Sequence, residues 1–186
     1  VIAVIKIFHI DYETYNSGAK YISYLLTPAT VCLAIPLYRQ ISVLKEHAKE
    51  VFIGILAGVL ASMGSILLMS YLFGLTREQY VTLLPKSITT AIGMGVSEEL
   101  GGIQTITVAV IIITGVLGNI IAEAVLKIFR IKEPVAKGLA IGTASHAIGT
   151  TKALEIGEIE GTMSSLSVAV AGLMTVISAS IFANMM

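Results

Sequence analysis

The sequence has no tryptophan, a single cysteine and few charged residues. Only 13% of its 186 residues are charged, against about 25% in a typical soluble domain. The formal net charge is zero at pH 7, so no basic surface points to nucleic acid. The lone cysteine, Cys32, cannot form an intrachain disulfide. No paired nucleophile and base, phosphate loop or metal-ligand spacing occurs, so we expect neither an enzyme nor a bound metal or cofactor.

Apolar residues dominate the composition of the chain. They make up 55% of the chain, and the mean hydropathy is +0.89. Three long stretches, 51–73, 103–126 and 162–186, each exceed the roughly 20 apolar residues that a transmembrane helix needs. We therefore predict an all-α polytopic membrane protein, with residues 1–186 forming a single transmembrane domain in the lipid bilayer. Residues 1–10 reach only about 15 Å as a helix, which predicts the end of a span whose beginning is missing.

One further stretch is long enough to cross a bilayer but poorly suited to contact with lipid. Residues 134–152 read P-V-A-K-G-L-A-I-G-T-A-S-H-A-I-G-T-T-K. Gly142 and Gly149 loosen the helix, and hydroxyls and an imidazole stand where alkyl side chains are expected. In lipid, such a backbone is tolerated only where protein or water satisfies its polar groups. The segment is therefore predicted to be an unwound or re-entrant helix that lines a cavity.

Two other segments share this character. Residues 83–98 contain Pro85, and residues 25–38 contain Pro28, together with several hydroxyl side chains. Each proline removes a backbone donor and breaks the helix around it. Broken polar segments among apolar helices are the best sequence indication of a transporter binding site.

Positive charges in the loops predict the topology, because lysine and arginine in short loops mark the cytoplasmic side. Loop 39–50 has three such residues and loop 127–137 has four. Both lie inside only if residues 80–98 enter from the outside and return. We therefore predict about six spans plus this re-entrant segment. In this assignment 134–152 crosses outward, so the acidic loop 152–161 lies outside.

The same assignment predicts inverted repeats, which are typical of secondary carriers. A competing similarity between 25–38 and 83–96 favours a parallel repeat, in which 80–98 crosses the membrane. The sequence leaves both arrangements open. Each predicted repeat has three segments, of which the middle one is broken. The first repeat comprises 1–10, 21–38 and 51–73, and the second comprises 103–126, 134–152 and 162–186.

The polar segments also carry the cations expected near membrane depth. A lysine at the centre of a span costs roughly 2.5–3.5 kcal/mol, so it needs a cavity, a partner or the interface. We predict a site for a small carboxylate, in which Lys86 supplies the charge and His146 donates a hydrogen bond or carries a proton. The predicted substrate-binding residues are Lys86, Ser87, Thr89, Thr90, Thr143, Ser145, His146, Thr150 and Lys152.

Each of these residues has a structural alternative. His146 could hydrogen-bond a neighbouring helix, and Lys152 could extend to the outer surface. Serine and threonine commonly join helices within membranes.

The run G-L-A-I-G-T-A-S-H-A-I-G-T-T-K-A-L-E-I-G-E-I-E-G, residues 138–161, resembles the LrgB/CidB family. Residues 84–94 (L-P-K-S-I-T-T-A-I-G-M) and 28–38 (P-A-T-V-C-L-A-I-P-L-Y) are similar to two further motifs of that family. The resemblance covers essentially the whole chain and implies that about one N-terminal span is missing. It implies a multi-pass protein of the bacterial inner membrane. The family is described as antiholin-like, paired with a holin-like LrgA/CidA protein, and its relatives include carriers of pyruvate and of plastid glycolate and glycerate.

We therefore expect a membrane carrier for small monocarboxylates such as pyruvate or glycolate, working with an LrgA-like partner and as a homo-oligomer. The alternative is an antiholin-like regulator of murein hydrolase activity and lysis that restrains a holin-like protein without transport. A third possibility is an ungated channel. The broken polar segments favour the carrier, because a pure interaction protein needs no polar interior.

Overall fold

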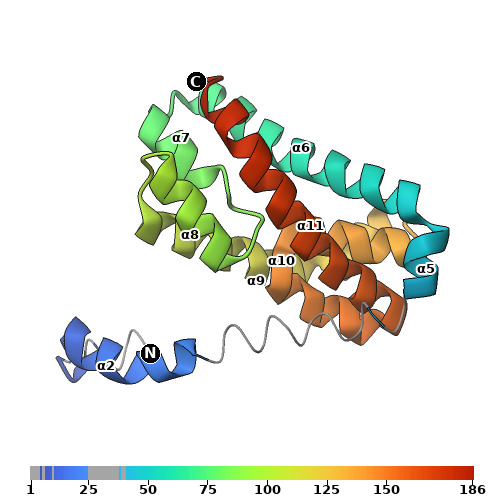
Figure 1. The fold of residues 1–186 in the computed structure, drawn as a ribbon, viewed down its shortest axis with the longest axis horizontal. Helices are drawn as coiled ribbons and strands as arrows, with labels where there is room; N and C mark the ends of the chain where they lie inside the picture. The colour runs from blue at the N-terminus through green and yellow to red at the C-terminus, as the bar shows by residue number, and fades with distance from the viewer. Residues whose placement is uncertain (1–4, 6, 10, 25–37, 39–40) are drawn as a thin grey trace. The chain divides into compact units, whose positions relative to one another are not determined.

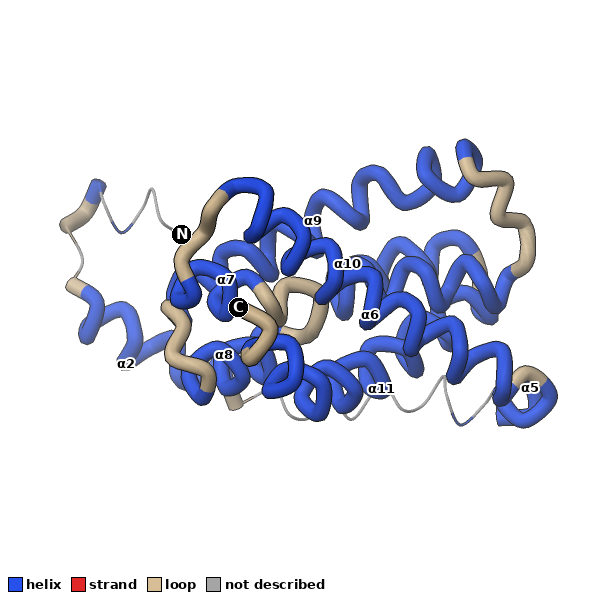
Figure 2. Tube along the Cα trace, turned by 90° about the horizontal axis from the view of Figure 1, so that it is seen from above, coloured by secondary structure: helices blue, strands red, loops and turns tan. Residues whose placement is uncertain are grey.

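The computed structural model describes residues 5, 7–9, 11–24, 38 and 41–186 (Figure 1). Within these ranges the chain forms helices joined by turns, without any strand (Figure 2). The predicted all-α fold is therefore confirmed for this part of the chain. The predicted break at Pro28 lies outside the described residues, as does most of the predicted span 21–38.

The chain divides into two compact units, 1–35 and 36–186. The first contains helix α2 (Tyr12–Ser23). Asp11 caps this helix, because its carboxylate accepts hydrogen bonds from the backbone N–H of Glu13 at 2.8 Å and the Thr14 hydroxyl at 2.8 Å. These bonds, with the Glu13 backbone bond foremost, hold the pKa of the Asp11 carboxyl below its usual value.

Three long helices frame the second unit, after the short helix α5 (Ile41–Glu46). They are α6 (Ala48–Phe73), α9 (Gln104–Ile128) and α11 (Glu158–Ala183). Each is long and apolar enough to cross a membrane, with mean hydropathies of 2.4, 2.3 and 2.1 over their most apolar stretches. The three predicted apolar spans are thus helices of spanning length. The inward faces of α6 and α11 meet in a core that includes Ile55, Met63 and Met163, each at most 1% exposed. Helix α9 packs instead on α8 (Thr90–Glu99) and α10 (Pro134–Ile156).

Between α6 and α9 the chain folds back on itself. Helices α7 (Arg77–Leu83) and α8 (Thr90–Glu99) are joined by residues 84–89, which include Pro85. At about 1.5 Å per residue, neither helix is long enough to cross a bilayer. Thr107, in the second turn of α9, lies beside both arms: its Oγ1 is 2.8 Å from the Thr82 carbonyl oxygen and 2.7 Å from Ser97 Oγ. Both arms therefore lie next to the start of α9.

Thr107 gives a direct test of this junction. Because its hydroxyl is fully buried, Thr107→Val removes a buried group that joins the Thr82 carbonyl to the Ser97 hydroxyl, at almost unchanged volume. We expect a loss of about 1–3 kcal/mol in the free energy of unfolding, measured by thermal or denaturant unfolding in detergent. The exposed Thr105 on the same helix is the control, and Thr105→Val should be nearly silent. Equal effects of the two substitutions would contradict a specific role for Thr107.

Helix α10 (Pro134–Ile156) also folds back, with its non-helical residue at His146 (φ 42°, ψ −144°). A Cβ added to Gly138 would lie 2.7 Å from Met163 Cβ, and one added to Gly161 would lie 2.7 Å from Leu154 Cγ. In a straight helix Gly138 and Leu154 would be about 24 Å apart, so they could not both contact the first turns of α11. The chain therefore reverses at His146, and Figure 1 shows both halves of α10 beside the start of α11.

This reversal corrects two sequence predictions. Residues 134–152 are interrupted at His146, as expected of an unwound segment, but they do not form the continuous outward span of the predicted topology, because α10 begins and ends at the same end of the 36–186 unit. Loop 152–161 therefore lies at the same end as 127–137, and Lys152 Nζ is 2.7 Å from Glu123 Oε1 near the end of α9. The loop charges could not reveal this, because acidic residues contribute little to topology.

The position of the break also differs from the prediction. Gly142 and Gly149 are helical, and the residue that leaves the helical region lies between them. Gly142 instead permits close packing, because a Cβ there would lie 2.9 Å from Ser164 Cα in α11.

Candidate functional site

A cavity of ≈ 690 Å³ lies between α6, the first half of α10 and the 84–89 connection. One end of it is charged, with His47, Glu50 and Glu133. The other end, beside the middle of α6, is polar. No group of three or more histidine, cysteine or acidic side chains is placed to hold a metal anywhere in the described ranges. The hydroxyl and ammonium groups of the polar end belong to Ser62, Ser65, Lys86, Ser87 and Thr143.

Lys86 is the cation of this cavity. Its ammonium lies 2.9 Å from Ser87 Oγ and 3.4 Å from Ser62 Oγ, and the Ser62 hydroxyl donates to Ser87 Oγ at 2.9 Å. A turn holds the lysine in place, since its backbone N–H donates to the Leu83 carbonyl at 3.1 Å. No ion pair found within the described ranges includes Lys86. Its charge is therefore hydrogen-bonded to hydroxyls, with no carboxylate to balance it there.

Small residues on α6 let α10 approach the cavity. A Cβ added to Gly58 would lie 2.8 Å from Thr143 Oγ1, and one added to Gly54 would lie 3.2 Å from Leu139 Cδ1. The Thr143 hydroxyl donates to the Leu139 carbonyl at 2.8 Å, so towards a ligand it can only accept a hydrogen bond. The structure thus brings Lys86, Ser87 and Thr143 together around one space.

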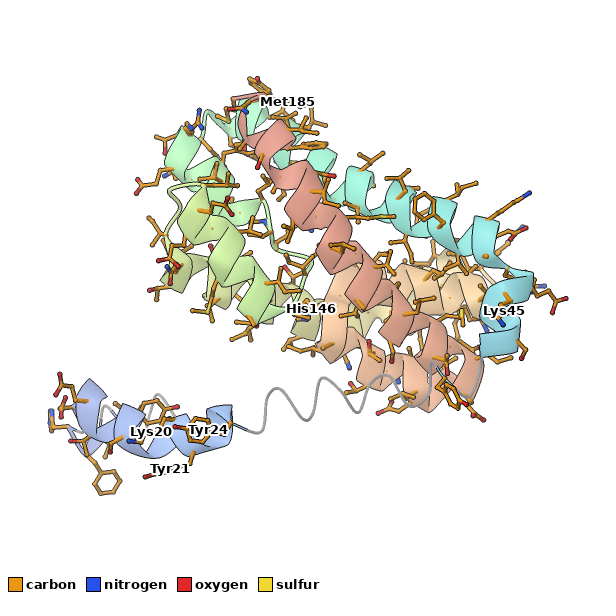
Figure 3. All side chains as sticks on the ribbon, viewed as in Figure 1. Lys20, Tyr21, Tyr24, Lys45, His146 and Met185 are labelled. Atoms are coloured by element: carbon orange, nitrogen blue, oxygen red, sulfur yellow. The ribbon has the colours of Figure 1, made fainter. Side chains whose placement is uncertain are left out.

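His146 takes a different position. In Figure 3 it lies between the end of the unit marked by Lys45 and the end marked by Met185. Its side chain is 2% exposed, and Nε2 lies 2.9 Å from the Ile111 carbonyl oxygen of α9. Because a carbonyl only accepts, Nε2 carries the proton. A Cβ on Gly115 would lie 2.8 Å from that nitrogen, so this glycine makes room for the imidazole. The observed contact is the alternative that the sequence left open, a hydrogen bond to a neighbouring helix.

The remaining polar residues of α10 also contact other helices. Ser145 packs against Gly118 of α9. Thr150 Oγ1 is 3.1 Å from the His146 carbonyl oxygen and 2.8 Å from Ser164 Oγ of α11. Asn119 of α9 donates to the Ile148 carbonyl at 3.0 Å. Side chains of α9 and α11 therefore bond to carbonyl and hydroxyl groups that follow the break.

Three predicted site residues lie away from the cavity. Lys152 Nζ is 2.7 Å from Glu123 Oε1 and 3.0 Å from Glu155 Oε2, so its charge is balanced. Thr89 precedes α8 and Thr90 begins it, and neither lines the cavity. Ser62 was missed by the sequence analysis, since a serine on an apolar helix carries no signal of its own.

Long apolar helices, polar fold-backs and a lysine without an acidic partner among the described residues together define an α-helical membrane protein with a polar site open to the surface of the 36–186 unit. The chain belongs to the LrgB-like family, whose family model matches residues 1–185. It is 39% identical over 176 residues to the "Antiholin-like protein LrgB" of Bacillus mycoides (strain KBAB4), covering 95% of this chain and 76% of that protein. The proteins of the same name from Bacillus cereus (strain B4264) and Bacillus anthracis (strain CDC 684 / NRRL 3495) match with the same identity and coverage. No solved structure matches the chain.

Proposed function

We propose that the chain is a membrane carrier for small monocarboxylates such as pyruvate or glycolate, and not an enzyme. The observation that carries this proposal is the Lys86 ammonium, which lies in a cavity of ≈ 690 Å³ with hydroxyl neighbours and no acidic partner among the described residues. A substrate carboxylate would pair with Nζ and accept from the Ser87 hydroxyl, because the Ser62 proton is donated to Ser87 Oγ. The volume falls in the range of ordinary small-molecule sites, about 300–1,000 Å³.

The two fold-backs support a carrier. Tyr80, in α7, donates to the Phe182 carbonyl at 3.0 Å, near the end of α11. Helix α10 has its base beside the start of α11, where Lys137 Nζ is 3.5 Å from Glu160 Oε1. The fold-backs therefore enter from opposite ends, and a small space lined by Pro85 and Thr143 among others separates their inner parts. Such an arrangement is expected of an inverted repeat with substrate held between broken helices.

This arrangement leads to a revised topology for the bacterial inner membrane. We propose that α6, α9 and α11 are three of the spans of a multi-pass protein. Residues 80–98 enter from the outside and return, as the loop charges predict, and α10 enters from the inside and returns. One repeat then consists of α6 and the fold-back formed by α7 and α8. The other consists of α9 and the fold-back formed by α10. The predicted total of about six spans depends on residues outside the described ranges.

Cysteine accessibility tests this topology. In a Cys32→Ser background, Arg77→Cys and Glu99→Cys should both react with an impermeant thiol reagent added to intact cells. Lys132→Cys and Glu155→Cys should react only after permeabilisation. If only one of Arg77→Cys and Glu99→Cys reacted in intact cells, residues 80–98 would cross the membrane. If only one of Lys132→Cys and Glu155→Cys did so, α10 would cross it.

Transport itself is tested by uptake of labelled pyruvate, glycolate and lactate into proteoliposomes, with and without an LrgA-like membrane protein. Saturable uptake of at least one of them above protein-free vesicles is expected. A linear, unsaturable flux would instead indicate an ungated channel.

The names of the curated relatives favour one alternative, an antiholin-like regulator of murein hydrolase activity and lysis that acts on a holin-like partner without transport. The two functions differ in their dependence on the cavity. A regulator without transport should keep its effect on lysis when Lys86 is replaced, whereas a carrier should lose uptake.

A further inference from the structure

A second pocket, of ≈ 650 Å³, lies where the end of α9 meets the base of the α10 fold-back. We call it the basic pocket. It is separate from the cavity that holds Lys86, and no residue lines both. Its ten lining residues are the cations Lys127, Arg130, Lys132, Lys137 and Lys152, the carboxylates Glu123 and Glu155, and the apolar Leu126, Ile131 and Ile156.

Ion pairs balance only some of these cations. Lys152 lies between Glu123 and Glu155, at 2.7 Å and 3.0 Å. Lys137 is 3.5 Å from Glu160, which lies outside the lining. None of the ion pairs within the described part of the chain includes Arg130 or Lys132. The pocket therefore has a surplus of positive charge at these two residues.

The backbone of Arg130 gives an independent indication. Its φ is 55°, in the left-handed region. Helix α9 ends there in a Schellman-type turn, in which the Ile131 N–H donates to the Leu126 carbonyl at 2.9 Å and the Arg130 N–H to the Lys127 carbonyl at 3.1 Å. Glycine is the usual residue at this position because it has no Cβ penalty. An arginine held in an unfavourable conformation beside an open pocket indicates a side chain with a function.

The surroundings of the pocket match a ligand that is acidic at one end and apolar at the other. Ile128 and Phe129 are 74% and 72% exposed, directly before Arg130 at the end of a helix of membrane-spanning length. Exposed apolar side chains and cations at one level are characteristic of the bilayer interface. Basic pockets between transmembrane helices on the cytoplasmic side suit the headgroups of anionic lipids.

We propose that the basic pocket binds the phosphate headgroup of an anionic phospholipid from the surrounding bilayer. Arg130 and Lys132 contact the phosphate, and the acyl chains lie along the apolar surface near Phe129. The lipid then bridges the end of α9 and the base of α10, which stabilises the fold-back from outside the transport cavity.

The test measures binding of phosphatidylglycerol to the full chain in detergent, from the shift in its melting temperature with lipid concentration. Phosphatidylglycerol should raise the melting temperature, whereas phosphatidylcholine and inorganic phosphate should not. The double variant Arg130→Gly, Lys132→Gln should bind it about 25-fold more weakly, since each cation near an anionic lipid contributes roughly fivefold. The matched control, Lys45→Gln with Lys49→Gln, makes the same charge change at exposed lysines near the start of α6 and should leave the affinity unchanged.

Arg130→Gly also separates binding from folding. Glycine suits the left-handed turn, so this variant without lipid should melt at or above the temperature of the parent protein. A lower melting temperature without lipid would make Arg130 a structural residue and overturn the proposal. If the control pair weakened the binding of phosphatidylglycerol equally, the lipid would be held by non-specific charge attraction. If inorganic phosphate alone stabilised the protein, the pocket would be a site for a soluble anion. Either result overturns the lipid assignment.

Discussion

Lys86→Gln should reduce carboxylate uptake by about ten- to a hundredfold. A hydrogen bond to a charged group contributes roughly 1.5–3 kcal/mol, and every 1.4 kcal/mol or so corresponds to a factor of ten in affinity. Glutamine keeps a polar group in the cavity but removes the positive charge that would balance the substrate. The measurement is the initial rate of uptake of labelled pyruvate in proteoliposomes across a range of concentrations, per amount of inserted protein.

Folding should be unaffected or slightly improved by this substitution. A lysine near membrane depth is costly, and no acidic side chain among the described residues loses a partner when Lys86 is replaced. Lys49→Gln serves as the control, because Lys49 is exposed at the start of α6 and does not line the cavity. Normal uptake by Lys86→Gln at limiting substrate would refute the proposed site. A loss of uptake matched by a loss of inserted protein would make Lys86 structural.

The sequence predicted the parts of this fold that depend on composition. Helices α6, α9 and α11 are recognisable because uninterrupted apolar stretches of this length have few other structures available. The fold-back at 77–99 is indicated by Pro85 and its hydroxyl-rich neighbours. Three of the predicted substrate-binding residues, Lys86, Ser87 and Thr143, line one cavity.

Contacts between distant helices could not be predicted in the same way. The turn at His146 depends on an imidazole that reaches the Ile111 carbonyl, and on Gly115, which leaves room for it on α9. The glycines of α10 are the obvious candidates for a break, yet Gly142 serves close packing instead. Lys152 resembles a site residue until its pairing with Glu123 on another helix is known. Such pairings follow from tertiary packing and have no local pattern.

The reversal at His146 predicts a graded set of variants at one position. The imidazole makes a buried hydrogen bond to α9, and the backbone adopts φ 42°, which is unfavourable for most residues. His146→Ala loses the hydrogen bond and keeps the unfavourable backbone. His146→Gly loses the bond but relaxes the backbone. His146→Gln keeps the backbone strain of the parent protein and offers an amide N–H donor at about the reach of imidazole Nε2.

We therefore expect the melting temperature of the purified protein to fall least for His146→Gln, more for His146→Gly and most for His146→Ala. The alanine variant should lose about 1–3 kcal/mol in the free energy of unfolding from the lost hydrogen bond, because the strained backbone is common to it and to the parent protein. Uptake per inserted protein should follow the same order, because the fold-back positions Thr143 at the cavity. A direct substrate contact would give a different pattern, in which all three variants melt like the parent protein and none transports. That pattern would return His146 to the substrate site, whereas rescue of both stability and uptake by glutamine would establish it as the residue that fixes the turn.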